Sequence, residues 1–182
     1  MKSVRVTCFL LLAAVFISGC GYTTGSLFPE HLKTIRIQPF RNRMELTKEL
    51  PYDQYRFRSY SPHLETDITR EVVDRFINDG HLKVVKEEDA DLILSGELVD
   101  YLTQPVRFGG DNETVEEYRI SIVCSVEVRD VKENNFLWKD SRVIGDATYN
   151  ISGTYAVSET TAISNAVSDL ARRIANHTIE GW

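Results

Sequence analysis

Cysteine is scarce in this sequence of 182 residues, and its three occurrences, Cys8, Cys20 and Cys124, lie far apart. This scarcity excludes a framework of disulfides and a zinc site built from several cysteines. Cys124 is the only cysteine beyond the N-terminal segment, and it lies in a run that alternates apolar with polar residues. We therefore expect Cys124 to be a small buried hydrophobic residue rather than a redox centre.

Basic residues are also in the minority. The chain has 21 Lys and Arg against 27 Asp and Glu, which gives a formal net charge of −6. Binding to nucleic acid is driven by the release of counterions from a basic surface. The charge balance therefore argues against a nucleic-acid partner.

Motifs that carry chemistry are missing as well. The sequence contains no Gly-x-Ser-x-Gly elbow, no phosphate-binding loop and no dinucleotide-binding glycine pattern. Its four histidines, at 31, 63, 81 and 177, show no pair at the spacing of metal ligands. We expect no catalytic residue, no metal site and no cofactor, and hence no enzyme.

Only one long hydrophobic run is present, and it is followed by a recognisable processing site. Lys2 and Arg5 precede the apolar stretch Phe9–Ile17, which is too short to span a bilayer but has the length of a signal peptide. Ser18 and Gly19 then lead to Cys20, the pattern that a bacterial lipoprotein signal peptidase recognises. The alternative is an ordinary secretory signal with a chance cysteine.

Cleavage before Cys20 predicts three parts of the chain. Residues 1–19 form the removed signal peptide, residues 20–32 a tether acylated at Cys20, and residues 33–182 one domain. The mature chain has 182 − 19 = 163 residues, with 19 basic and 27 acidic side chains, because Lys2 and Arg5 are lost with the signal. Several acyl chains on one residue give stable anchoring. Gly21, rather than Asp, follows the cysteine, so we expect a lipid anchor on the periplasmic side of the outer membrane.

Hydrophobic periodicity predicts strands and helices in the body of the chain. The expected strands cover Lys33–Pro39, Leu82–Val85, Leu92–Leu102, Glu116–Asp130 and Phe136–Tyr149, with a bulge or twist near Asp140 and Gly145. One expected helix begins with Ser61 as its N-cap and Pro62 in its first turn, and ends at Gly80. A second expected helix covers about Ser158–Asn176.

Each predicted helix carries an apolar stripe. The stripe of the first helix comprises Leu64, Ile68, Val72 and Phe76, widened by Val73 and Ile77, and that of the second comprises Ile163, Ala166, Val167, Leu170 and Ile174. The order of elements predicts an α+β fold. We expect a two-layer sandwich in which two helices cover one face of a mostly antiparallel, four- to five-stranded sheet. Residues 41–60 show no clear period and are left open as a long loop or an elaboration.

A succession of short motifs resembles one known family. These are Cys20 with Gly21-Tyr22, Leu32–Ile37, Asp79–Val85, Ala90–Gly96, Glu117–Ile122, Leu137-Trp138 and Asp169–Ile174. In this order they are similar to the LptE family of lipopolysaccharide-assembly lipoproteins. The resemblance covers most of the mature chain.

The resemblance implies a function. Members of the family plug the large β-barrel translocon (LptD-like) that inserts lipopolysaccharide into the outer leaflet, assist its assembly, and are thought to bind lipopolysaccharide. Family loops contact the phosphates of the glycolipid through basic residues. Arg107, expected in a hairpin loop before the strand at Glu116, is the one position that carries over, whereas Asn150–Val157 contains no Lys or Arg.

Three alternatives stay open at this point. Arg107 could be an ordinary solvated arginine. The protein could instead be a pilot or adaptor lipoprotein of another envelope complex, such as a secretion system, because fold alone does not set function. It could also be a structural tether without glycolipid contact.

Overall fold

The computed structural model describes residues 29, 31–44, 62–110 and 113–180. The predicted signal peptide, Cys20 and most of the tether lie outside the described residues, as do residues 45–60 of the segment left open above. Among the described residues, no helix has the length and hydropathy needed to cross a membrane.

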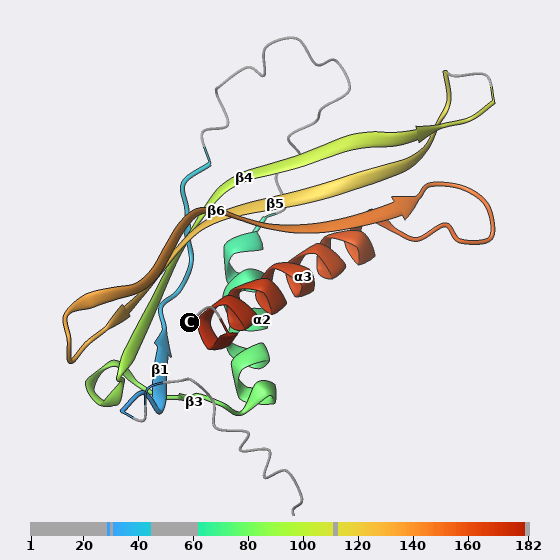
Figure 1. Ribbon diagram of the computed structural model, residues 1–182. Helices are drawn as coiled ribbons and strands as arrows, with labels where there is room; N and C mark the ends of the chain where they lie inside the picture. The colour runs from blue at the N-terminus through green and yellow to red at the C-terminus, as the bar shows by residue number, and fades with distance from the viewer. Residues whose placement is uncertain (1–28, 30, 45–61, 111–112, 181–182) are drawn as a thin grey trace, which may run out of the picture.

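The elements follow one another as a short α/β unit and then three long strands and a helix (Figure 1). The first part contains β1 (Thr34–Ile37), β2 (Arg41–Asn42), α2 (Leu64–Asp79), β3 (Lys83–Val84) and a 3₁₀ turn (Glu87–Asp89). The second part contains β4 (Leu92–Phe108), β5 (Val115–Asp130), β6 (Asn135–Asn150) and α3 (Glu159–Glu180).

These strands form one mixed sheet in the order β3-β1-β4-β5-β6, with β2 also paired to β4. β4, β5 and β6 are antiparallel, whereas β1 is parallel to both β3 and β4. The α+β class is confirmed, but the sheet has six strands and is not purely antiparallel. The physical reason is that α2 serves as the crossover connection that a parallel pair such as β1 and β3 requires.

Both helices lie on the same face of the sheet, as predicted (Figure 1). α3 packs against β5, β6 and α2, and α2 also contacts β1 and β3. The predicted stripe of α2 is correct in Leu64, Ile68, Val72 and Phe76, which are all fully buried. Ile77, in contrast, is 59% exposed, so the stripe is narrower than predicted.

The ends of the helices agree with the sequence in two of four places, the end of α2 and the start of α3. Gly80 closes α2 in a left-handed conformation (φ 79°), and its N–H donates to the carbonyl of Phe76. The Ser158 side chain accepts the N–H of Thr161 and caps α3, which extends to Glu180 rather than Asn176. The predicted start of α2 is wrong, because the helix begins at Leu64 with His63 as its N-cap. Pro62 is in the preceding turn, and Ser61 lies outside the described residues.

The long strands deviate from the prediction at two points. β4 continues to Phe108, six residues beyond the predicted end, because its ladder with β5 resumes after each register shift and ends only where Phe108 pairs with Val115. The predicted bulge near Asp140 is present, since Cys124 pairs with Val143 while Val126 pairs with Asp140. Gly145 is not part of a bulge. It lies where α3 packs on β6.

Asp169 fastens α3 to the edge of the sheet. Its Oδ2 accepts the backbone N–H of Asp146 on β6 at 3.1 Å and the Nε–H of Arg173 at 2.7 Å, and Arg172 pairs with its other oxygen. Burial alone would raise the pKa of Asp169, but the hydrogen bonds from Asp146, Arg173 and Arg172 outweigh it and lower this pKa. A free N–H of the edge strand is thereby satisfied.

The contact at Gly145 leaves no room for a side chain. A Cβ there would lie 2.4 Å from the carbonyl oxygen of Ala166 and 2.5 Å from Cβ of Leu170. We expect Gly145→Ala to lower the free energy of unfolding by roughly 1–3 kcal/mol, because the helix must shift. Gly110→Ala is the control, since nothing lies within 4 Å of its added Cβ. Equal urea midpoints for the two variants would contradict this packing.

Asp169 also predicts a dependence of stability on pH. Its pKa in the folded state lies below the ordinary value of 3.8, so its contribution is present at neutral pH and is lost as the pH falls through the folded value. We expect Asp169→Asn to lower the free energy of unfolding at pH 7 by on the order of 1 kcal/mol and to flatten the acid decline. Asp74 of α2 is exposed and offers a control. If Asp74→Asn changed the pH profile of stability as much as Asp169→Asn does, this role of Asp169 would be refuted.

Candidate functional site

The distal end of the sheet, which we define as the last residues of β4, the first of β5 and the last of β6 with the loop 151–158, projects beyond the helices (Figure 1). Arg107 lies here, in β4 itself, and not in the hairpin loop that the sequence predicted. The loop prediction fails because the ladder between β4 and β5 continues to Phe108, opposite Val115.

The guanidinium of Arg107 reaches across three strands. Its Nε–H donates to Glu117 at 3.3 Å, its Nη2 donates to Asn150 Oδ1 at 2.6 Å, and its Nη1 pairs with Glu116. The strand register places these groups in one row, because Arg107 faces Glu117 and Glu117 faces Asn150. The side chain of Arg107 is 51% exposed, so it remains accessible from solvent.

In the free protein, these two glutamates compensate the positive charge of Arg107. Two carboxylates from β5 occupy part of the fork of N–H donors that arginine offers to a planar oxyanion. A phosphate could bind the same fork, but it would have to compete with Glu116 and Glu117. Ion pairs that are exposed to this extent are weak, so the competition is physically feasible.

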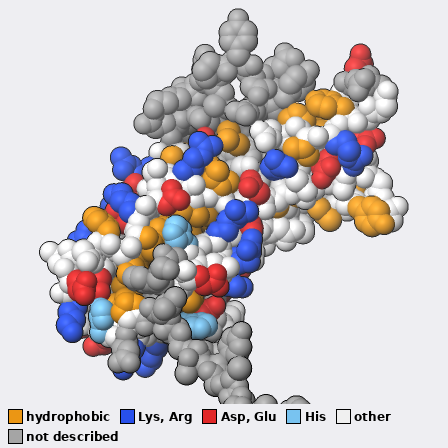
Figure 2. Space-filling view, viewed as in Figure 1, with side chains coloured by type: hydrophobic (Ala, Val, Ile, Leu, Met, Phe, Trp, Pro, Cys, Tyr) orange, Lys and Arg blue, Asp and Glu red, His pale blue; other side chains and the backbone are white. Residues whose placement is uncertain are grey.

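Large apolar side chains at the same end of the sheet are also exposed. They come from β4 and from the loop after β6, and comprise Val106, Phe108, Ile151, Tyr155 and Val157. Figure 2 shows hydrophobic side chains gathered over the distal part of β4 and over the loop that follows β6. Tyr155, at 82%, is the most exposed of them. Groups of exposed apolar residues of this kind mark surfaces that contact another molecule.

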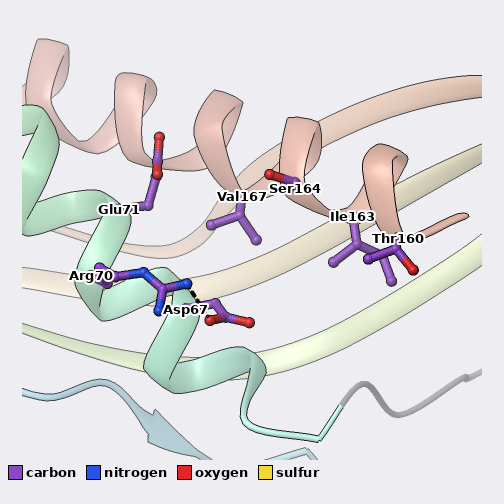
Figure 3. Close-up of a pocket in the computed structure, with 7 residues that line it drawn as sticks. All are labelled: Asp67, Arg70, Glu71, Thr160, Ile163, Ser164 and Val167. Atoms are coloured by element: carbon purple, nitrogen blue, oxygen red, sulfur yellow. Dashed lines mark hydrogen bonds and ion pairs between the residues drawn. The ribbon is translucent and has the colours of Figure 1, made fainter. Parts of the chain in front are cut away.

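A recess lies between the two helices (Figure 3). It has a volume of about 280 Å³ and is lined by Asp67, Arg70 and Glu71 of α2 and Thr160, Ile163, Ser164 and Val167 of α3. Arg70 and Asp67 pair with each other at 2.6 Å. The lining holds no histidine or cysteine and offers no arrangement of nucleophile and base.

Cys124 lies within β5 and is fully buried, as its place in the alternating pattern predicted. Burial raises the pKa of its thiol strongly. Because the thiolate is the reactive form, this residue is inert at neutral pH. Cys20, the predicted site of lipid attachment, lies outside the described residues.

The sequence pattern did not predict the partners of Arg107. Glu116 and Glu117 stood at the start of the expected strand Glu116–Asp130, and Asn150 was part of a stretch without basic residues. Only the register of the three strands reveals that these residues meet. The alternation of apolar and polar residues in β4 was the available signal. To predict the position of Arg107, this alternation would have had to be extended past the register shift that follows Leu98.

Comparison with solved structures places the fold among small bacterial proteins. The hypothetical protein CT253 from Chlamydia trachomatis has 14% sequence identity and a TM-score of 0.50, covering 81% of this chain and 98% of that one. Protein XCC0632 from Xanthomonas campestris has 11% identity and a TM-score of 0.51, covering 84% and 87%. At this identity the likeness concerns the fold alone. No functionally curated protein shows significant similarity to the chain.

Comparison with protein families gives a match over most of the chain. The family is LptE, described as lipopolysaccharide-assembly, and the match runs over residues 32–178. It begins just before β1 and ends in the last turn of α3, so it includes every described strand and both helices. This chain therefore belongs to the LptE family of lipopolysaccharide-assembly lipoproteins.

Proposed function

We propose that this protein is an outer-membrane lipoprotein, anchored through Cys20 on the periplasmic side, that plugs an LptD-like β-barrel translocon and assists its assembly. We further propose that it binds lipopolysaccharide at the distal end of its sheet through Arg107. The role is one of binding and assembly, without catalysis. Membership of the LptE family supports the proposal.

The exposed distal end of the sheet is the structural observation that best supports this proposal. The three long strands extend past the helices, and at this end Val106, Phe108, Ile151, Tyr155 and Val157 are exposed. An apolar surface with a single charged row suits a site that is covered in a complex, because leaving it in water is unfavourable. We assign this end of the molecule to contact with the barrel and the glycolipid.

The glycolipid contact follows from the chemistry of the row. A phosphate of lipid A or of the core would accept two parallel hydrogen bonds from the guanidinium of Arg107. Binding would displace Glu116 and Glu117, whose charges then repel the ligand unless they turn away. The affinity of the site thus depends on the balance between one arginine and two carboxylates.

Purification of the tagged full chain from detergent-solubilised outer membranes tests the plug role. We expect one large β-barrel protein in stoichiometric amount. A secretin ring or a peptidoglycan enzyme in its place would overturn the proposal and support a pilot or adaptor.

A Cys20→Ala variant is the control for anchoring. In cells depleted of the barrel, we expect this variant in the soluble periplasmic fraction. If it still sedimented with the membranes of these cells, the lipid anchor would be contradicted.

The role of Arg107 is tested by lipopolysaccharide binding at fixed ionic strength. We expect Arg107→Ala to weaken binding roughly ten- to a hundred-fold, the value of a hydrogen-bonded charge, and Arg107→Asp to weaken it further. Glu116→Gln and Glu117→Gln should strengthen binding, because they remove the competing carboxylates. Thermal stability should change little, since these side chains are half exposed.

Arg70→Ala provides the matched control. Arg70 is 68% exposed and ion-paired on α2, away from the distal end, so its loss should leave binding unchanged. Equal binding by the wild type, Arg107→Ala and Arg70→Ala would exclude Arg107 as a ligand while leaving the plug role intact.

A further inference from the structure

His31, Asp130 and Glu133 come together at the other end of the sheet, in the turn between β5 and β6. His31 precedes β1 and reaches this turn from far away in the sequence. Its Nε2 lies 3.0 Å from Oδ2 of Asp130. One ligand atom from each of the three residues lies within 4.8 Å of the others. This group has no part in the distal end.

Asp130 is held in place as a metal-binding carboxylate needs to be. It is only 2% exposed, and its Oδ1 accepts the backbone N–H groups of Lys132 at 2.8 Å and Glu133 at 2.9 Å. Oδ2 is thereby directed toward His31. Burial opposes the charge, but the hydrogen bonds from Glu133, His31 and Lys132 outweigh it, so the pKa of Asp130 lies below its ordinary value.

We propose that His31, Asp130 and Glu133 form a three-ligand site for Zn²⁺. One imidazole nitrogen and two carboxylate oxygens are a donor set that zinc accepts, with the fourth tetrahedral position left to water. Bonds of about 2.0–2.2 Å place tetrahedral ligand atoms roughly 3.3 Å apart. The 3.0 Å between His31 and Asp130 is close to this spacing.

Glu133 offers the third ligand atom of the site. Its exposed side chain follows Asp130 by three residues, and its Oε2 accepts a hydrogen bond from Asn135 at 3.1 Å. Such an outer partner orients a ligating carboxylate. The imidazole favours zinc over Mg²⁺ and Ca²⁺, which prefer all-oxygen sites.

A metal bound here would join two distant segments. His31 lies in the segment that leads into β1, while Asp130 is the last residue of β5 and Glu133 lies in the turn that follows. Zinc would therefore fix the N-terminal segment to the sheet and stabilise the folded state by mass action.

Calorimetric titration of the full chain with ZnCl₂ tests the site. The protein is purified in detergent without a polyhistidine tag and stripped with EDTA. We expect saturable binding of one zinc per chain and a higher melting temperature, with no effect of MgCl₂. Absence of saturable zinc binding would overturn the proposal and leave His31 and Asp130 as an ion pair only.

Two variants and a matched control locate the binding. His31→Gln keeps an N–H donor for Asp130, and Glu133→Gln keeps an acceptor for Asn135, so both should fold. We expect each to weaken zinc binding at least about tenfold, the loss that even an outer-shell partner causes.

His81→Gln is the control, because His81 pairs with Asp79 and no described carboxylate makes a third ligand there. This variant should bind zinc as the wild type does. Equal affinities of His31→Gln and His81→Gln would refute the site. Because no lipopolysaccharide is present, the outcome is independent of the proposed function.

Discussion

The packing of α3 on the inner face of β5 and β6 is the contact on which the rest of the structure depends. Gly145 lets the helix backbone approach the edge strand closely, and Asp169 joins helix and strand through the N–H of Asp146. Leu170 and Ile174 of α3 are fully buried in the core, and their burial supplies the apolar part of the same contact. α2 then packs on α3 and closes the core over β1 and β3. Without this contact the edge strand and one face of the sheet would be open to water.

The position of α3 also decides which part of the sheet is free. The strands run past the start of the helix, so their distal ends have no cover from either helix (Figure 1). Arg107 and the exposed apolar side chains lie in this uncovered part. A site that contacts a partner can be built there because the core does not need those residues.

The two ends of β5 differ in chemistry for a physical reason. At its start, Glu116 and Glu117 share the half-exposed Arg107, so the charges stay hydrated and exchangeable. At its end, Asp130 is buried and held by two backbone amides and a histidine. Hydrated ion pairs can be displaced by a ligand, whereas an oriented buried carboxylate is suited to hold a fixed partner. The start of β5 is therefore suited to exchanging its ion pairs for a ligand, and the end of β5 is suited to holding a fixed partner.

Local pattern in the sequence determined the periodic parts of this protein: the buried face of β5 with Cys124, the stripe of α2 from Leu64 to Phe76, and the Gly80 cap. These follow from hydrophobic periodicity and backbone preference, which act between residues a few positions apart. The succession of short motifs also determined the family. Tertiary structure alone decided the parallel pairing of β1, the extension of β4 to Phe108, and the meeting of Arg107 with Asn150 and of His31 with Asp130. Each of these depends on strand register and on contacts between residues far apart in the chain. Local periodicity carries no information about either.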